Sequence, residues 1–122
     1  TSTGGRTNKR YGRIGDSPII GASTYADNSY CGISSTGYGE QFIRHVAAHS
    51  VYSLMKYKNM AVKEAAEEIM YNEMKGIEGG MIVLDAQGNF AMPFNTPVMN
   101  RGYITMKGAP KVFIYKTETD SL

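Results

Sequence analysis

The 122-residue sequence predicts an α+β fold, in which helices and strands occupy separate stretches of the chain. Residues 40–57 and 61–74 place apolar side chains three and four residues apart, which is the period of an amphipathic helix. The segments before and after them show short apolar stretches separated by glycine, serine and asparagine, as strands and turns do. Because the strands do not alternate with helices, we do not expect a βαβ sheet.

The first half of the chain is predicted to pass from loop to strand to helix. Residues 1–17 are rich in glycine, serine, threonine and arginine and are expected to form a loop. Residues 18–36 alternate apolar stretches with turn residues, and the clearest strand among them is 30–35. The first helix follows over 40–57 and is interrupted at 58–60.

The second half is predicted to return from helix to strands. The second helix, 61–74, carries acidic residues on its outer face and ends at a group of three glycines. Residues 85–89 have the composition of a hairpin turn, in which Gly88 can take a positive φ. Strands are expected at residues 81–84, 90–94, 102–106 and 112–115.

Composition limits the class of protein. A hydrophobic content of 42% and a charged content of 20% predict a packed core, and we treat residues 1–122 as a portion of a single domain. No apolar run approaches the roughly 18 residues of a membrane-spanning helix. No basic segment followed by an apolar one opens the sequence. We expect a cytoplasmic location, although the sequence also allows a periplasmic or secreted one.

Charge, cysteine and histidine content argue against a nucleic-acid partner, an internal disulfide and a metal site. Residues 1–13 hold four basic side chains and no acidic one, but four charges give only a modest phosphate contribution, so we expect no nucleic-acid partner. Cys31 is the only cysteine, which rules out an internal disulfide and disfavours a zinc site. His45 and His49 are spaced for one helix face, but Val46 stands where a zincin has glutamate, so we expect no metal site.

The segment Ser35–Glu40 joins the predicted strand to the first predicted helix. Gly37 and Gly39 let the backbone approach a ligand closely, and the unpaired N–H groups at a helix start favour a negative charge. This segment can therefore bind a carboxylate or stabilise an oxyanion. The alternative interpretation is a tight turn with Glu40 in the first helical turn.

The segment Gly12–Pro18 is the second candidate. Arg13 and Asp16 lie three residues apart in a glycine-rich loop, where the guanidinium can bind an α-carboxylate and the carboxylate an α-ammonium. The alternative interpretation is a local Arg–Asp pair on the surface.

The segment Thr1–Gly5 is the third candidate. A threonine at a free N-terminus can act as nucleophile, with its own α-amine as base. Hydroxyl-rich segments next to two glycines are also common in plain loops.

In their order, these segments resemble the β subunit of plant-type L-asparaginases/isoaspartyl peptidases, which are N-terminal-nucleophile hydrolases. The Gly-Arg-x-Gly-Asp-Ser-Pro and Thr-Gly-x-Gly blocks are specific when they occur together. The resemblance covers nearly the whole chain. It is carried by the blocks Thr1–Gly5, Asn8–Lys9, Gly12–Pro18, Gly21–Ala22, Tyr25–Asn28, Ser35–Glu40, Phe42–Arg44, Asn89–Thr96 and Met99–Gly102.

The resemblance implies an αββα sandwich built from two chains that are cut autocatalytically from one precursor. The present chain would be the β-subunit portion, completed by the α subunit and by an upstream β-hairpin. Two αβ units would associate as a dimer. The family's reaction implies a small amino-acid or dipeptide substrate and no cofactor.

The resemblance also implies roles for individual residues. Arg13 would bind the substrate α-carboxylate, while Asp16 and Gly39 would contact its α-ammonium. The oxyanion hole would be formed by Thr36 and Gly37.

The nucleophilic threonine of this family heads a strand, and the segment that matches Thr1–Gly5 ends the return strand of the same hairpin. We therefore expect the nucleophile one hairpin upstream of Thr1, and we do not assign that role to Thr1. Thr3 would lie beside the nucleophile and hydrogen-bond its hydroxyl.

The reaction implied is hydrolysis of β-aspartyl amide bonds, in L-asparagine or in isoaspartyl dipeptides. Two alternatives stay open. Glycosylasparaginases share the Gly-Arg-x-Gly-Asp-Ser-Pro block but lack the Pro93–Thr96 block and usually carry Asn-Gly in place of Gly4–Gly5. A non-catalytic amino-acid-binding domain would keep Arg13 and Asp16 without a nucleophile.

Overall fold

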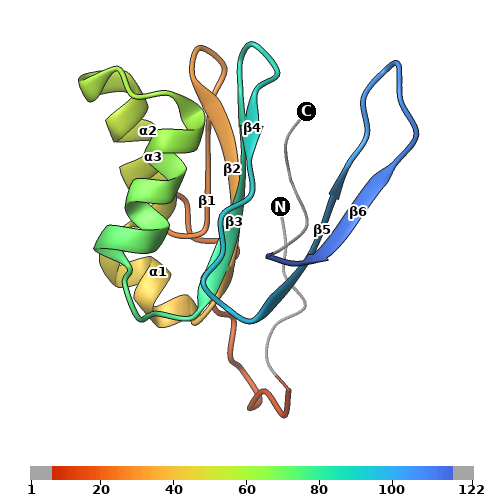
Figure 1. Ribbon diagram of the computed structural model, residues 1–122. Coiled ribbons are helices and arrows are strands. Elements are labelled where there is room, and N and C mark those ends of the chain that lie inside the picture. Colours follow the sequence, from red (N-terminus) through yellow and green to blue (C-terminus); the bar gives the residue numbers. More distant parts are fainter. Residues whose placement is uncertain (1–6, 117–122) are drawn as a thin grey trace.

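The computed structural model describes residues 7–116 and combines a four-stranded sheet, a layer of helices and a separate hairpin (Figure 1). The strand–helix–strand order confirms the predicted mixed fold. The elements are β1 (Thr24–Asp27), β2 (Cys31–Gly37), α1 (Gly39–His45), α2 (Ala47–Lys58), α3 (Val62–Glu67), η1 (Glu68–Glu73), β3 (Gly79–Asp85), β4 (Phe90–Ala91), β5 (Val98–Tyr103) and β6 (Lys111–Tyr115).

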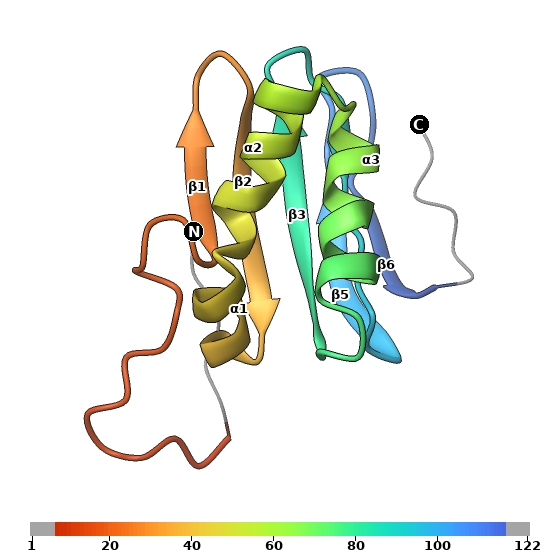
Figure 2. The same cartoon turned by 90° about the vertical axis from the view of Figure 1, so that its left-hand side faces the viewer.

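The main sheet is antiparallel, in the order β1-β2-β3-β4, and β5 pairs with β6 in a second, two-stranded sheet. The helices cover one face of the main sheet, and the β5–β6 hairpin lies on the other side (Figures 1 and 2). The core lies between helices and sheet, because apolar side chains alternate along the strands and recur along one helix face. Its largest fully buried apolar side chains are Phe42, Met70, Met74, Met81, Val51 and Val83.

The face of the main sheet away from the helices is called the open face below. Alternation places every second residue there, and the register of β2 against β3 pairs these residues directly. Ile82 and Leu84 lie on it and are 48% and 53% exposed. The open face consists of the pairs Thr36–Gly80, Ser34–Ile82 and Gly32–Leu84.

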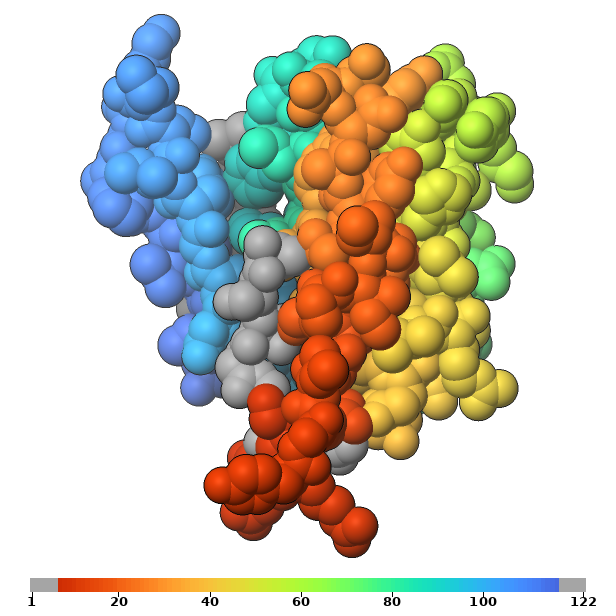
Figure 3. All heavy atoms as spheres, turned by 180° about the vertical axis from the view of Figure 1, so that it is seen from behind, coloured from red at the N-terminus to blue at the C-terminus, as the bar shows by residue number. Residues whose placement is uncertain are grey.

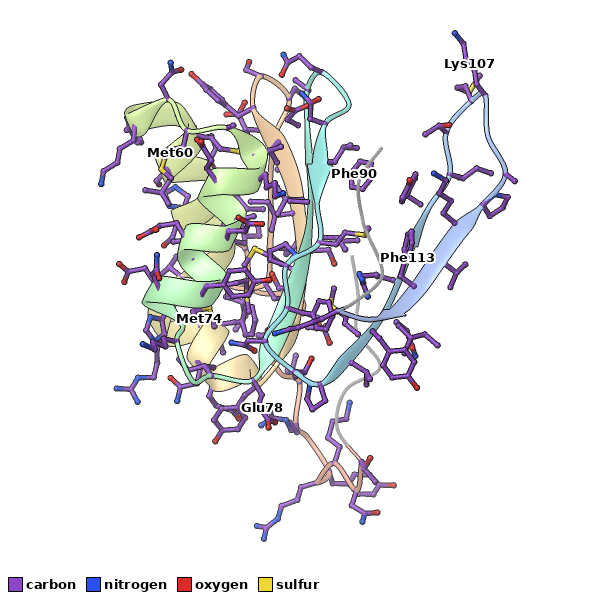
Figure 4. The ribbon with its side chains drawn as sticks, in the orientation of Figure 1. Met60, Met74, Glu78, Phe90, Lys107 and Phe113 are labelled. Atoms are coloured by element: carbon purple, nitrogen blue, oxygen red, sulfur yellow. The ribbon has the colours of Figure 1, made fainter. Side chains whose placement is uncertain are left out.

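Aromatic rings connect the open face to the hairpin. The Tyr103 ring lies 4.6 Å from that of Phe90 and 6.1 Å from that of Phe113, between centroids. Figure 4 labels Phe90 on the sheet side and Phe113 on the hairpin side. A hollow of about 510 Å³ remains beside these rings, and Figure 3 shows the hairpin standing apart from β4 at one end.

The prediction of one continuous helix over residues 40–57 is wrong, because the chain breaks at Val46. This residue adopts φ 48° and ψ 46°, a left-handed conformation that is costly for a β-branched side chain. The amides of Ala48 and His49 donate to the carbonyls of Ala22 and Gly21, at 2.9 and 3.0 Å. These bonds satisfy donors at the start of α2 that have no partner within the helix.

The predicted helix over residues 61–74 is present, but its second half is the π-helix η1. The Met74 amide donates to the Ile69 carbonyl at 2.9 Å, across five residues. Ile69, Met70 and Met74 are all buried against the core. The wider turn therefore accompanies a continuous apolar face.

Three predicted strands, 30–35, 81–84 and 112–115, correspond to β2, β3 and β6 within two residues, and two others differ more. The strand expected at 90–94 is interrupted: Phe90–Ala91 pair with β3, and pairing resumes at Phe94, which bridges to Gly80. The interruption includes Pro93, which lacks an amide hydrogen for the ladder, although its carbonyl accepts from the Met81 amide at 3.0 Å. The strand expected at 102–106 lies earlier, at Val98–Tyr103, and a turn follows in which the Gly108 amide donates to the Thr105 carbonyl.

Candidate active site

Two segments that the sequence singled out meet at one end of the main sheet. The loop of residues 7–20 projects beyond the body of the molecule (Figures 2 and 3) and lies against the start of α1. Thr36 and Gly37 end β2, and Gly39 begins α1 only two residues later. The geometry therefore brings the Arg–Asp loop and the Thr-Gly-x-Gly turn together.

Arg13 forms a two-pronged ion pair with Glu40. The Arg13 Nη1 atom donates to Glu40 Oε1, and Nη2 donates to Oε2 at 3.1 Å. The hydrogen bond that the Arg13 guanidinium donates to Glu40 raises the pKa of Arg13, which remains charged. The alternative of a local Arg13–Asp16 surface pair is not observed, since the carboxylate that binds Arg13 comes from α1.

Asp16 is 6% exposed and packs against Gly39. A β-carbon placed on Gly39 would lie 2.5 Å from Asp16 Oδ1, so only glycine leaves room for this carboxylate. The other oxygen, Oδ2, is buried and has no hydrogen-bond partner among residues 7–116. A buried acceptor without a partner is costly, so this carboxylate is suited to receive a cationic donor.

Thr36 lies on the open face, and both Thr36 and Gly37 are exposed, but the neighbouring backbone leaves no room for a side chain on Gly37. Gly37 has φ 141°, and a β-carbon there would lie 2.6 Å from both the Glu78 carbonyl oxygen and Gly79 Cα. The next amide, that of Tyr38, donates to the same Glu78 carbonyl at 3.2 Å. The end of β2 is thus held against the backbone of residues 78–79.

Sequence reasoning missed three contributors to this site. Glu40 was placed only in a helical turn, although its charge opposite to that of Arg13 was a usable signal. Gly79 is one of the three glycines predicted to end the second helix, but it is the first residue of β3, in contact with Gly37. Asn95 holds Gly79 through side-chain and backbone hydrogen bonds.

Some predictions fall outside this geometry. Thr3 and Thr1 lie outside the described residues. His45 and His49 belong to different helices, because the chain breaks at Val46. Within residues 7–116 no group of three or more His, Cys, Asp or Glu side chains is placed to hold a metal ion. No helix of the described part is long and apolar enough to cross a membrane.

Comparisons with known proteins point to one family. A family model described as Asparaginase matches residues 1–114. The isoaspartyl peptidase of Escherichia coli is 42% identical over 124 aligned residues, which cover 100% of this chain and 39% of the relative. The isoaspartyl peptidase of Salmonella typhimurium is 42% identical, covering 95% and 38%. The isoaspartyl peptidase/L-asparaginase of Xenopus laevis is 37% identical, covering 82% and 33%. The chain therefore spans less than half the length of these relatives.

Proposed function

The chain belongs to the Asparaginase family, and on this premise we propose that the whole protein hydrolyses β-aspartyl amide bonds, in L-asparagine or in isoaspartyl dipeptides. The relatives named above support the substrate class, because their names specify isoaspartyl peptidase or L-asparaginase. The observation that carries the proposal is the buried Asp16 carboxylate, which packs against Gly39, two residues after the end of β2, and has one oxygen without a partner in the described residues.

Substrate binding is assigned to the loop and the start of α1. Asp16 Oδ2 accepts a hydrogen bond from the substrate α-ammonium, which also contacts the backbone of Gly39. Arg13 binds the α-carboxylate. Two of the five guanidinium N–H donors are used by Glu40, so others remain for the substrate. This pairing selects an aspartyl group with a free amine and a free α-carboxylate.

The chemical step requires an N-terminal threonine, which we place in sequence upstream of Thr1. Its hydroxyl oxygen attacks the side-chain carbonyl carbon, and its α-amine accepts the hydroxyl proton. The tetrahedral oxyanion is stabilised by the Thr36 hydroxyl and the Gly37 N–H group. Collapse breaks the C–N bond and expels the amine, which takes up the proton. Water then cleaves the acyl-enzyme ester and releases L-aspartate.

The open face supports the proposed architecture. Ile82 and Leu84 are half exposed on it, which a sheet tolerates poorly unless other structure covers it. We place the second sheet of an αββα sandwich over this face, formed by the upstream hairpin and the α subunit. Two such αβ units associate in the proposed assembly.

Replacing Arg13 tests its assignment as the residue that binds the substrate α-carboxylate. In the whole protein, Arg13→Ala removes a charged donor and is expected to lower kcat/KM for a β-aspartyl dipeptide by about ten- to a hundredfold, mainly through KM. Arg10→Ala is the matched control, since Arg10 is an exposed arginine of the same loop. Equal kinetics for both variants would refute the role of Arg13.

A further inference from the structure

Asn95 makes a set of hydrogen bonds that the proposed function does not use. Its side-chain Oδ1 accepts a hydrogen bond from the Gly79 amide at 2.8 Å, and its backbone N–H group donates to the Gly79 carbonyl at 3.0 Å. Its Nδ2 donates to the Ile77 carbonyl and lies 3.5 Å from the Met74 carbonyl oxygen. One half-buried side chain therefore joins the end of η1 to the start of β3.

The backbone that Asn95 holds lies directly against the end of β2. The Glu78 carbonyl accepts the Tyr38 amide, and the Glu78–Gly79 backbone leaves no room for a side chain on Gly37. A β-carbon on Gly79 would in turn lie 2.8 Å from the Thr36 carbonyl oxygen. Figure 4 places Glu78 at this end of the sheet, next to the N-terminal loop.

The helix layer also packs against the contact between Gly37 and residues 78–79. Phe42 of α1 is fully buried, and its ring lies under both glycines, so that a β-carbon on Gly79 would approach ring atoms to 2.8 Å. Gly37 thus packs against both the Phe42 ring and the backbone of residues 78–79. Asn95 is hydrogen-bonded to the backbone of Ile77 and Gly79, on either side of Glu78.

We propose that Asn95 is a positioning residue for the oxyanion hole, acting through the backbone of residues 77–79 on Thr36 and Gly37. This inference rests on the proposed function and deepens it. An amide is required at this position, because Gly79 offers a donor and Ile77 offers an acceptor. A carboxylate can accept from Gly79, but it places a second acceptor against the Ile77 carbonyl.

The proposal predicts a change in kcat rather than in KM. The oxyanion forms only in the tetrahedral intermediate and the transition states beside it. The residues that bind the substrate in its ground state lie on the loop of residues 7–20 and on α1. A shift of the oxyanion donors by a fraction of an ångström in Asn95→Ala is expected to lower kcat about ten- to a hundredfold. A residue that merely stabilised the fold would alter the amount of active protein at high temperature and leave kcat per folded molecule unchanged.

The experiment compares Asn95→Asp, Asn95→Ala and Asn89→Ala in the whole, processed protein. Asn89 is the matched control, since it also bonds a turn through its amide, at the opposite end of β3. Protonation restores a donor to the carboxyl group in Asn95→Asp. The ratio of its kcat to that of the wild type is therefore expected to rise as the pH falls through the pKa of the introduced carboxyl. Asn89→Ala is expected to keep the wild-type kcat at every pH.

Hydrogen exchange at the Tyr38 amide provides a readout that needs no activity. Faster exchange in Asn95→Ala but not in Asn89→Ala supports the proposal. Wild-type kcat in both Asn95 variants, a loss that appears only in KM, or unchanged Tyr38 exchange would overturn it. If the wild-type protein hydrolyses no β-aspartyl substrate, the proposed function fails, and the exchange data alone decide whether Asn95 positions the turn.

Discussion

At the scale of residues, the candidate site depends on which carboxylate pairs with the Arg13 guanidinium and which is left for the substrate ammonium. Arg13 is held by Glu40 of α1, and this leaves Asp16 Oδ2 with no partner among residues 7–116. The sequence pattern of Arg13 and Asp16 predicted that both serve one ligand. It could not show that Glu40 is the partner of Arg13, because that contact spans 27 residues and depends on how the loop packs against the helix.

Cys31 is predicted to be an unreactive thiol. It is 4% exposed, and burial, together with the carboxylates of Asp27 and Asp85, raises the pKa of its thiol from 9.0 to about 11. The folded state therefore retains a proton that the unfolded state loses, so the stability that Cys31 contributes is present below pH 9.0 and is lost as the pH rises toward 11.

Thiol labelling measures this directly. At pH 8 the native protein is expected to react with a thiol reagent far more slowly than the denatured protein does, because the thiolate is the reactive form. Labelling of the native protein at the denatured rate would contradict the burial of Cys31.

At the scale of elements, local patterns predicted which segments are helix or strand better than they predicted where these end. The apolar period continues through Val46, so the sequence carries no signal that the helix breaks there. The break is stabilised by residues distant in sequence, since the carbonyls of Gly21 and Ala22 accept hydrogen bonds from amides at the start of α2. The interruption of the strand after β4 has a local signal in the sequence, Pro93, although pairing resumes at Phe94. The π-helical turn has no such signal in the sequence, because the apolar period continues through it.

The junction of β2 and α1 predicts a sharp effect of a single methyl group. In Gly39→Ala the new β-carbon would lie 2.5 Å from Asp16 Oδ1 and 2.9 Å from its Cγ, so the carboxylate must move. We expect KM for a β-aspartyl dipeptide to rise about tenfold or more, as for loss of a charged hydrogen bond.

Gly108→Ala is the control for this change. Its β-carbon would meet only the Thr105 hydroxyl, at 3.2 Å, in the turn between β5 and β6. Steady-state kinetics of the two variants in the whole protein would contradict the Asp16 assignment if they gave the same KM.

At the scale of the whole molecule, the two faces of the main sheet differ in cover. The helices bury one face, while within residues 7–116 the open face meets the β5–β6 hairpin and the segment Pro93–Phe94, and a hollow of about 510 Å³ remains beside it. Periodicity alone predicted separate helices and strands. The αββα sandwich was predicted from the family resemblance, because periodicity does not predict what covers the open face.

A charge on the open face tests whether that face is covered in the whole protein. Ile82→Lys is expected to lower the free energy of unfolding by about 2 kcal/mol or more, because it would bury an ammonium between two sheets. Lys63→Glu is the control, since the Lys63 side chain is 73% exposed on the helix layer. Thermal unfolding and native mass spectrometry measure both variants, and an unchanged midpoint and assembly for Ile82→Lys would contradict a covered face.

The most direct test of the account is the release of L-aspartate from a pair of isomeric dipeptides by the whole protein. A β-aspartyl dipeptide presents a free α-amine and α-carboxylate to Asp16 and Arg13, whereas its α-aspartyl isomer has no free α-carboxylate on the aspartyl group. We predict that only the β isomer is hydrolysed. Hydrolysis of neither isomer, while calorimetry detects bound L-aspartate, would contradict the hydrolase and leave an amino-acid-binding domain in its place.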